Sequence, residues 1–162
     1  MSPLPTHAMV PFKRNRFVAR FPKLYRYSPA HFWLCEDPDD PGLWRVGLTH
    51  FATRMLGEIV EFDVETKPGA AVDPGAVIGW AEGMKAVTDL YCVLSGEMAV
   101  VNRDALDDPE LVCKDPYDRG WLYAVRGAPD QDTLGVEAYL EMLGEKIDAM
   151  EEQPWKSPEM AQ

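Results

Sequence analysis

The chain has 162 residues, of which 46% are hydrophobic, so it is long enough for one domain with a buried core and too short for two. Its 27 acidic and 16 basic side chains give a net charge of -11, which argues against nucleic acid as a partner. No apolar run has the length of a membrane span, so we expect a soluble protein.

Residues 1–26 differ from the rest of the chain in their charge. They hold six basic residues and no acidic one, a charge of +6, while the remaining residues carry -17. We expect this basic N-terminal extension to pack on the acidic body. Two alternatives are an arm that docks a partner and an organelle presequence, although four prolines and scarce serine argue against a presequence.

The next stretch alternates between strand signals and turn signals. Apolar runs over 32–35 and 43–48 predict two strands, joined by the proline-broken turn 36–42. Thr49 is a suitable N-cap for a short helix from His50 to Leu56, which Gly57 then ends. Residues 58–64 alternate in part between acidic and apolar side chains, as expected of a strand with one buried face.

A hairpin with a lysine at its tip is the central prediction. Runs rich in β-formers, 76–80 and 86–94, flank Gly83-Met84-Lys85, so we expect the turn to hold Lys85 away from the body. A lysine at such a place is most often a solvated surface charge. Acylation would instead make it an uncharged amide at the base of a long arm.

The last third of the chain predicts short elements and then a helix. Residues 103–112 predict a loop followed by a short helix, with Asp108 as the helix cap. Residues 121–125 predict a strand. Apolar residues recur at helical spacing over 135–151, which predicts an amphipathic helix that packs on the body in preference to a partner. We expect 152–162 to be a flexible tail.

Cysteine and histidine are too sparse to suggest a covalent or metal framework. The three cysteines are odd in number and lack CxxC spacing, which favours a reducing cytoplasm over a disulfide framework. Each cysteine can simply be a small buried hydrophobic residue. The three histidines are scattered through the chain, so no metal site is expected.

The segment 82–91, Glu-Gly-Met-Lys-Ala-Val-Thr-Asp-Leu-Tyr, with Ser-Gly-Glu at 95–97, resembles the lipoyl-lysine hairpin of the glycine cleavage H-protein family. The resemblance runs in order from about Tyr27 to Leu143. It implies a mostly β fold with a few helices, a lipoyl/biotinyl-type hybrid β-barrel-sandwich with Lys85 on a hairpin tip and a C-terminal amphipathic helix. The carrier domain would then span 27–151. Its further anchors are His31-Phe32-Trp33, Val46–Ala52, Leu56–Val60, Pro109–Val112, Asp115–Tyr117, Gly120–Leu122 and Glu137–Tyr139.

The resemblance also implies a cofactor and a role. Lipoate would be attached as an amide to Lys85. Biotin carriers usually present lysine between two methionines, and Ala86 departs from that pattern. The protein would be a covalent substrate of other enzymes and not itself an enzyme, with a lipoate-protein ligase or other lipoylation enzymes and dihydrolipoamide dehydrogenase as partners. Recognition around the site would involve Glu82, Gly83 and Asp89, although the two acidic residues equally suit ordinary solubility.

Two pathways remain open for such a carrier. H-like lipoate-binding proteins of sulfur-oxidising bacteria serve a heterodisulfide-reductase-like complex. The basic extension, the Gly83-Met84 pair and a possible redox or sulfur role for Cys92 and Cys113 favour that branch, in which the arm carries a sulfur-bound intermediate. The alternative is an H-protein that carries an aminomethyl group from glycine decarboxylase to aminomethyltransferase. A third possibility is a binding module without acylation.

Overall fold

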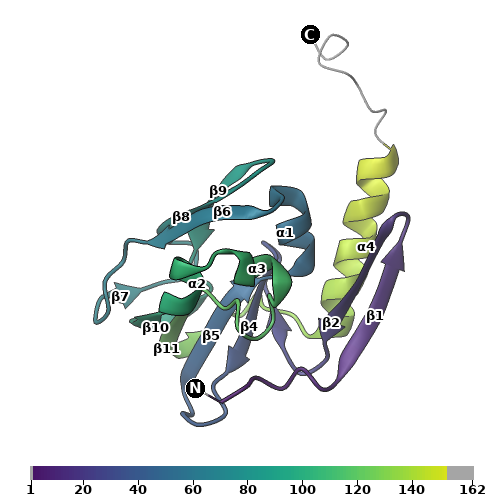
Figure 1. Cartoon of the computed structure of the whole chain (residues 1–162). Coiled ribbons are helices and arrows are strands. Elements are labelled where there is room, and N and C mark those ends of the chain that lie inside the picture. The colour runs from purple at the N-terminus through teal and green to yellow at the C-terminus, as the bar shows by residue number, and fades with distance from the viewer. Residues whose placement is uncertain (1, 153–162) are drawn as a thin grey trace.

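The computed structural model describes residues 2–152 and shows a mostly β fold with a few helices (Figure 1). This confirms the predicted fold class. None of the helices within the described part is both long and apolar enough to cross a membrane. The elements in chain order are β1 (Met9–Arg14), β2 (Phe17–Pro22), β3 (Arg26–Tyr27), β4 (Phe32–Glu36), β5 (Leu43–Leu48), α1 (His50–Leu56), β6 (Ile59–Val64), β7 (Ala71–Val72), β8 (Val77–Gly83), β9 (Val87–Tyr91), β10 (Leu94–Val101), α2 (Arg103–Asp107), α3 (Glu110–Lys114), β11 (Tyr123–Pro129) and α4 (Val136–Glu152).

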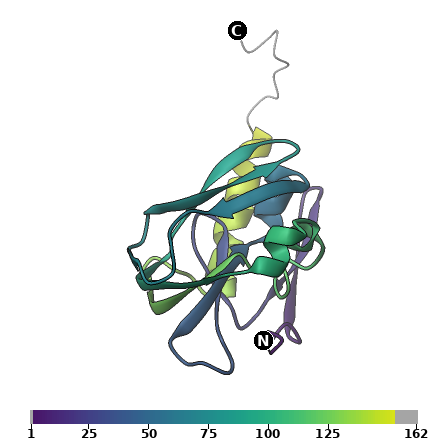
Figure 2. The same ribbon diagram turned by 60° about the vertical axis from the view of Figure 1, so that its left-hand side comes forward.

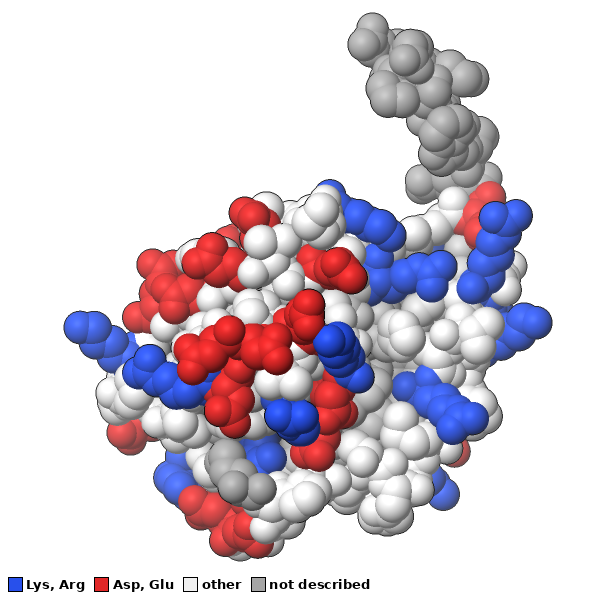
Figure 3. Space-filling view, viewed as in Figure 1, with Lys and Arg blue, Asp and Glu red and all other residues white. Residues whose placement is uncertain are grey.

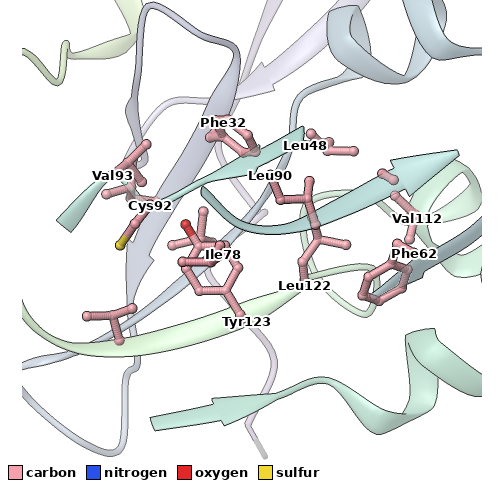
Figure 4. Close-up of a cluster of buried hydrophobic side chains, with 14 of the residues drawn as sticks. Phe32, Leu48, Phe62, Ile78, Leu90, Cys92, Val93, Val112, Leu122 and Tyr123 are labelled. Atoms are coloured by element: carbon pink, nitrogen blue, oxygen red, sulfur yellow. The ribbon is translucent and has the colours of Figure 1, made fainter. Parts of the chain in front are cut away.

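Two sheets enclose the main hydrophobic core. One sheet has six strands in the order β3-β4-β5-β11-β10-β7, and the other has three in the order β6-β8-β9. All pairs within them are antiparallel, and inward-facing residues of both sheets meet between them, which stabilises the sandwich by burying apolar surface. Figure 4 shows this cluster, which includes Phe32, Leu48, Phe62, Ile78, Leu90, Cys92, Val93, Val112, Leu122 and Tyr123.

A second core lies outside the sandwich, where the hairpin β1–β2 packs beside α4 (Figures 1 and 2). Strand β2 alternates, with Phe17, Ala19 and Phe21 buried and the residues between them exposed. The Phe21 ring packs against the Tyr139 ring of α4 at a centroid distance of 5.8 Å. One exposed ion pair, Arg14–Asp148 at 2.6 Å, joins the two elements. Apolar packing therefore holds the hairpin more than charge does, since exposed ion pairs stabilise little.

Helix α1 confirms the capping prediction. The Thr49 side chain accepts a hydrogen bond from the backbone N–H of Ala52 at 3.3 Å, and Gly57 ends the helix with a φ of 79°. At that φ a side chain would be strained, so the sequence needs glycine there. The helix thus begins and ends where the sequence predicted, and its C-terminal end supports the lysine hairpin.

The segment between β10 and β11 differs from the prediction. Residues 103–107 form helix α2 instead of a loop, because Ala105 is fully buried in the main core and tertiary packing outweighs the acidic local sequence. Helix α3 has Pro109 as its N-cap, while Asp108 is the C-cap of α2. The last strand starts at Tyr123 instead of Trp121, whose carbonyl accepts a bond from the Asn102 side chain.

The C-terminal helix α4 confirms the amphipathic pattern. Its residues Val136, Tyr139, Leu143 and Ile147 are buried in the second core, so this helix packs on the body as predicted. Of the predicted flexible tail 152–162, residues 153–162 lie outside the described residues.

Candidate functional site

The lysine hairpin forms as predicted. Strands β8 and β9 pair antiparallel with Glu82 opposite Val87, and the N–H of Gly83 donates to the carbonyl of Ala86 at 2.8 Å to close the turn. Met84 and Lys85 occupy its tip, and both side chains are exposed. The sequence places this lysine because a β-rich run on each side of a glycine-containing turn favours a hairpin.

The tip does not stand free of the body, which corrects the expectation for Lys85. Its backbone N–H donates to the carbonyl of Leu56 at 2.8 Å, and the N–H of Met84 donates to the carbonyl of Glu58 at 2.9 Å. These acceptors lie at and just after the C-terminal end of α1, where helix carbonyls lack partners within the helix. Local sequence patterns cannot reveal this contact, because the two segments are far apart in the chain.

The Lys85 side chain itself has an open environment. Its Nζ lies 3.5 Å from the carbonyl oxygen of Arg54, a long exposed contact, and it forms no ion pair with any side chain among residues 2–151. The aliphatic part of the Lys85 side chain passes close to Gly57, and only glycine leaves room there, because a Cβ at position 57 would lie 3.0 Å from Lys85 Cγ. The amine is therefore accessible to an acylating enzyme and held on an anchored backbone.

The three residues predicted to support recognition divide into two kinds. Glu82 and Asp89 are exposed, and their cross-strand partners Val87 and Trp80 place them on the same face of the hairpin. Gly83 is buried, and a Cβ there would lie 2.1 Å from the carbonyl oxygen of Leu56. The structure thus gives Gly83 a packing role, and it leaves the two carboxylates free to meet a partner.

The two cysteines of interest lie apart from each other in the fold. Cys113 is half-buried, with its Sγ 3.9 Å from the carbonyl oxygen of Gly57, and it lines a hollow together with Met84 of the tip. Cys92 is 1% exposed, follows the far end of β9 and donates to the carbonyl of Leu94 at 3.2 Å. Burial raises the pKa of both thiols. A thiol with a raised pKa is a poor nucleophile, so the structure disfavours thiol chemistry at Cys92.

We expect alkylation to separate these cysteines. In the native protein at pH 8, iodoacetamide should modify Cys92 at least about tenfold more slowly than in the urea-unfolded chain, because burial withholds the thiolate. Cys113 should react at an intermediate rate. Peptide mapping by mass spectrometry over time measures both rates. Equal rates for Cys92 in the native and unfolded chains would contradict its burial and restore a redox role.

An apolar hollow of about 270 Å³ lies beside the hairpin. Its walls come from α1, from β9 and from residues 30–32, with Met55 and Leu56 among its apolar lining. Asp89 and Lys146 are the charged residues that line it. Lipoate on Lys85 would reach roughly 14 Å, by addition of bond lengths, and its apolar chain would cover apolar surface in this hollow. The surroundings of Lys85 therefore fit such an arm.

His31, which lines the same hollow, is held neutral. Its ring Nδ1 lies 2.7 Å from the Tyr139 hydroxyl, and its Nε2 lies 3.3 Å from Lys146 Nζ. Burial, and to a lesser degree the Lys146 charge, lowers the pKa of His31 to about 4. The unfolded chain therefore binds more protons than the folded one between about pH 6.5 and pH 4.

We expect this histidine to make stability fall on acidification. The free energy of unfolding should drop by roughly 2–3 kcal/mol as the pH falls from about 6.5 to 4, because the folded state resists protonation of His31. NMR titration of the ring should give the low pKa directly. Urea unfolding at several pH values should give the slope of the free energy of unfolding against pH. His31→Asn tolerates the local φ of 73° and should flatten the slope. The comparison is His7→Gln, at an exposed position, which should leave the slope unchanged. An ordinary pKa for His31 would refute the buried network.

Comparison with known proteins identifies the family. The model of the glycine cleavage H-protein family matches residues 25–147. The chain belongs to the glycine cleavage H-protein family. The glycine cleavage system H protein of Klebsiella pneumoniae is 35% identical over 130 residues, which cover 76% of this chain and 98% of that protein. That of Streptomyces avermitilis is 38% identical over 124 residues, covering 76% and 97%.

A solved structure agrees with this assignment. The crystal structure of a glycine cleavage system H protein from Mycobacterium marinum is 32% identical, with a TM-score of 0.69, and the match covers 76% of this chain and 99% of that one. H-proteins are lipoyl carriers and not enzymes, so this chain is a carrier too. The family match starts at residue 25, so β1 and β2 lie outside it.

Proposed function

We propose that this chain is the H-protein of a glycine cleavage system, with lipoate attached as an amide to Lys85. The observation that carries the proposal is an accessible lysine on an anchored hairpin tip in a chain of this family. Bound lipoate supplies a dithiolane that opens to two thiols and closes by thiol–disulfide exchange. The carried group is the aminomethyl group that glycine decarboxylase supplies and aminomethyltransferase accepts.

The chain's own residues contribute position and not acid–base chemistry. Leu56 and Glu58 hold the tip backbone by two hydrogen bonds, so the base of the arm stays fixed while the arm moves. Glu82 and Asp89 place negative charge beside the arm, where it can steer a basic partner surface. The partners in this proposal are lipoylation enzymes, glycine decarboxylase, aminomethyltransferase and dihydrolipoamide dehydrogenase, all in the cytoplasm.

The comparisons favour this pathway over the sulfur-oxidation pathway that the sequence suggested. The relatives named above are all glycine cleavage system H proteins. Of the features that favoured sulfur oxidation, Cys92 is buried with a raised pKa, and the basic extension is an added hairpin. Neither feature supports a partnership with a heterodisulfide-reductase-like complex.

A reconstituted glycine cleavage assay tests the proposal. The lipoylated chain should replace the H-protein of the Klebsiella system in glycine-dependent NADH formation, at a rate within about tenfold of that protein. The matched control is the same chain before lipoylation, which should be inactive. A lipoylated chain that glycine and the decarboxylase fail to load would refute the glycine pathway, and a chain that its host never lipoylates would support the binding module.

A further inference from the structure

The outer face of the β1–β2 hairpin is both basic and apolar. In the strand register Lys13 lies opposite Val18 and Pro11 lies opposite Arg20, and all four side chains are exposed. Val18 is 61% exposed, a high value for a residue of this kind. Among the side chains of residues 2–151, neither Lys13 nor Arg20 has an ion-pair partner. The fold thus presents two uncompensated cations and an apolar side chain on one small surface.

This face forms one wall of a groove of about 780 Å³. The opposite wall comes from the end of α3 and the residues after it, namely Cys113, Lys114 and Pro116. Lys13 and Arg20 therefore stand on one wall, and Lys114, whose ammonium is paired with the exposed Glu110 at 2.7 Å, stands on the other, with apolar side chains between them. Figure 3 shows the contrast with the remaining surface, because acidic side chains gather over β6, β8 and the α2–α3 segment, whereas Lys and Arg predominate over β1 and β2.

The groove continues toward the candidate lipoyl site. Cys113 and Lys114 also line a second hollow, whose other residues include Met84 at the hairpin tip and Glu58, which accepts the Met84 N–H. A chain that lies in the groove would therefore end beside Lys85. A surface that guides a partner to the arm needs this continuity, which Cys113 and Lys114 provide. The other wall of the groove, the β1–β2 hairpin, lies outside the region that the family model matches.

The charge and shape of the groove indicate its occupant. Alternating cationic and apolar side chains along a strand complement an extended segment in which acidic and apolar residues alternate. A long polyanion such as nucleic acid, or an anionic membrane, would also meet the acidic surface over α2–α3 and be repelled. We propose that the groove between β1–β2 and α3 docks an extended acidic–apolar segment of an enzyme that acts on the Lys85 arm. The identity of that enzyme rests on the proposed function, whereas the docking chemistry does not.

Amide NMR shifts of the full, unlipoylated chain test the groove directly. The probe is a capped ten-residue peptide that alternates Glu and Val, added at about 50 mM salt. Shifts should concentrate at Val18, Arg20 and Lys114, and the affinity should fall about fivefold at about 200 mM salt because the contact is electrostatic. The same peptide with Lys in place of Glu should cause no shifts.

Two double variants with reversed charges, one in the groove and one elsewhere, test whether the groove cations bind the peptide. Lys13→Glu/Arg20→Glu should weaken peptide binding about tenfold or more, while Lys67→Glu/Arg103→Glu, which changes the net charge equally at exposed sites elsewhere, should not. Equal binding by both variants, shifts outside the groove, or shifts caused only by oligodeoxythymidylate or phosphatidylglycerol vesicles would overturn the proposal. Because the probe needs no lipoate, a negative result leaves the carrier function standing, and a failure of lipoylation leaves this result valid.

Discussion

Lys85→Arg should abolish carrier activity while leaving the fold unchanged. Arginine keeps the positive charge and the backbone hydrogen bond to Leu56, so the free energy of unfolding should change by less than about 0.5 kcal/mol. The guanidinium stays protonated and cannot accept the acyl group as lysine does. Intact mass should show one added lipoyl amide in the wild type and none in the variant, and glycine-dependent NADH formation should fall below detection.

A second lysine on an exposed turn provides the control for this substitution. Lys67 lies between β6 and β7, and Lys67→Arg should leave both the lipoyl mass and the activity unchanged. Full activity of the Lys85→Arg variant would show that the arm is attached elsewhere. An unmodified wild-type chain purified from its native host would instead favour the binding module over the carrier.

The second large effect is expected for Gly83→Ala, which should lower the free energy of unfolding because the added methyl group disturbs packing. The added Cβ would lie 2.1 Å from the carbonyl oxygen of Leu56 and 2.7 Å from its carbonyl carbon, and these backbone atoms cannot move aside as the end of a flexible side chain could. We expect a loss of about 2–3 kcal/mol in the free energy of unfolding, or roughly 5–10 °C in Tm. The tip should also leave α1, so the hydrogen bonds from Met84 and Lys85 are lost and lipoylation slows.

Gly135→Ala is the comparison for this effect. A Cβ at Gly135 meets nothing within 4 Å, so thermal unfolding should stay close to that of the wild type. Calorimetry gives the change in Tm for both variants, and amide exchange at Lys85 reports whether the tip is still bonded to α1. An unchanged Tm and a protected Lys85 amide in Gly83→Ala would contradict the close approach.

The two substitutions separate two requirements of the carrier. Lys85→Arg removes the attachment point and keeps the anchored tip, whereas Gly83→Ala keeps the lysine and disturbs the anchor. If carrier turnover depends on a fixed base for the arm, Gly83→Ala protein that is fully lipoylated should still transfer more slowly than the wild type. The orientation of the arm would then matter as well as its presence.

The sequence by itself determined the features that depend on neighbouring residues. Thr49 and Gly57 mark the start and the end of helix α1, because they are its capping residues. The β-rich runs around Met84 and Lys85 predicted the hairpin and its tip. The helical spacing of residues 135–151 likewise predicted α4. Such features are visible because hydrogen bonding and periodicity act within a few residues of one another.

Only the tertiary structure decided the features that join distant segments. It anchored Lys85 to Leu56, turned the 103–107 segment into a helix through the burial of Ala105, and buried Cys92 away from the tip. It also brought the basic strand face at Val18 to the end of α3, which created the groove. These outcomes depend on which surfaces pack together, and the free energy of that packing comes from contacts that no local pattern in the sequence records.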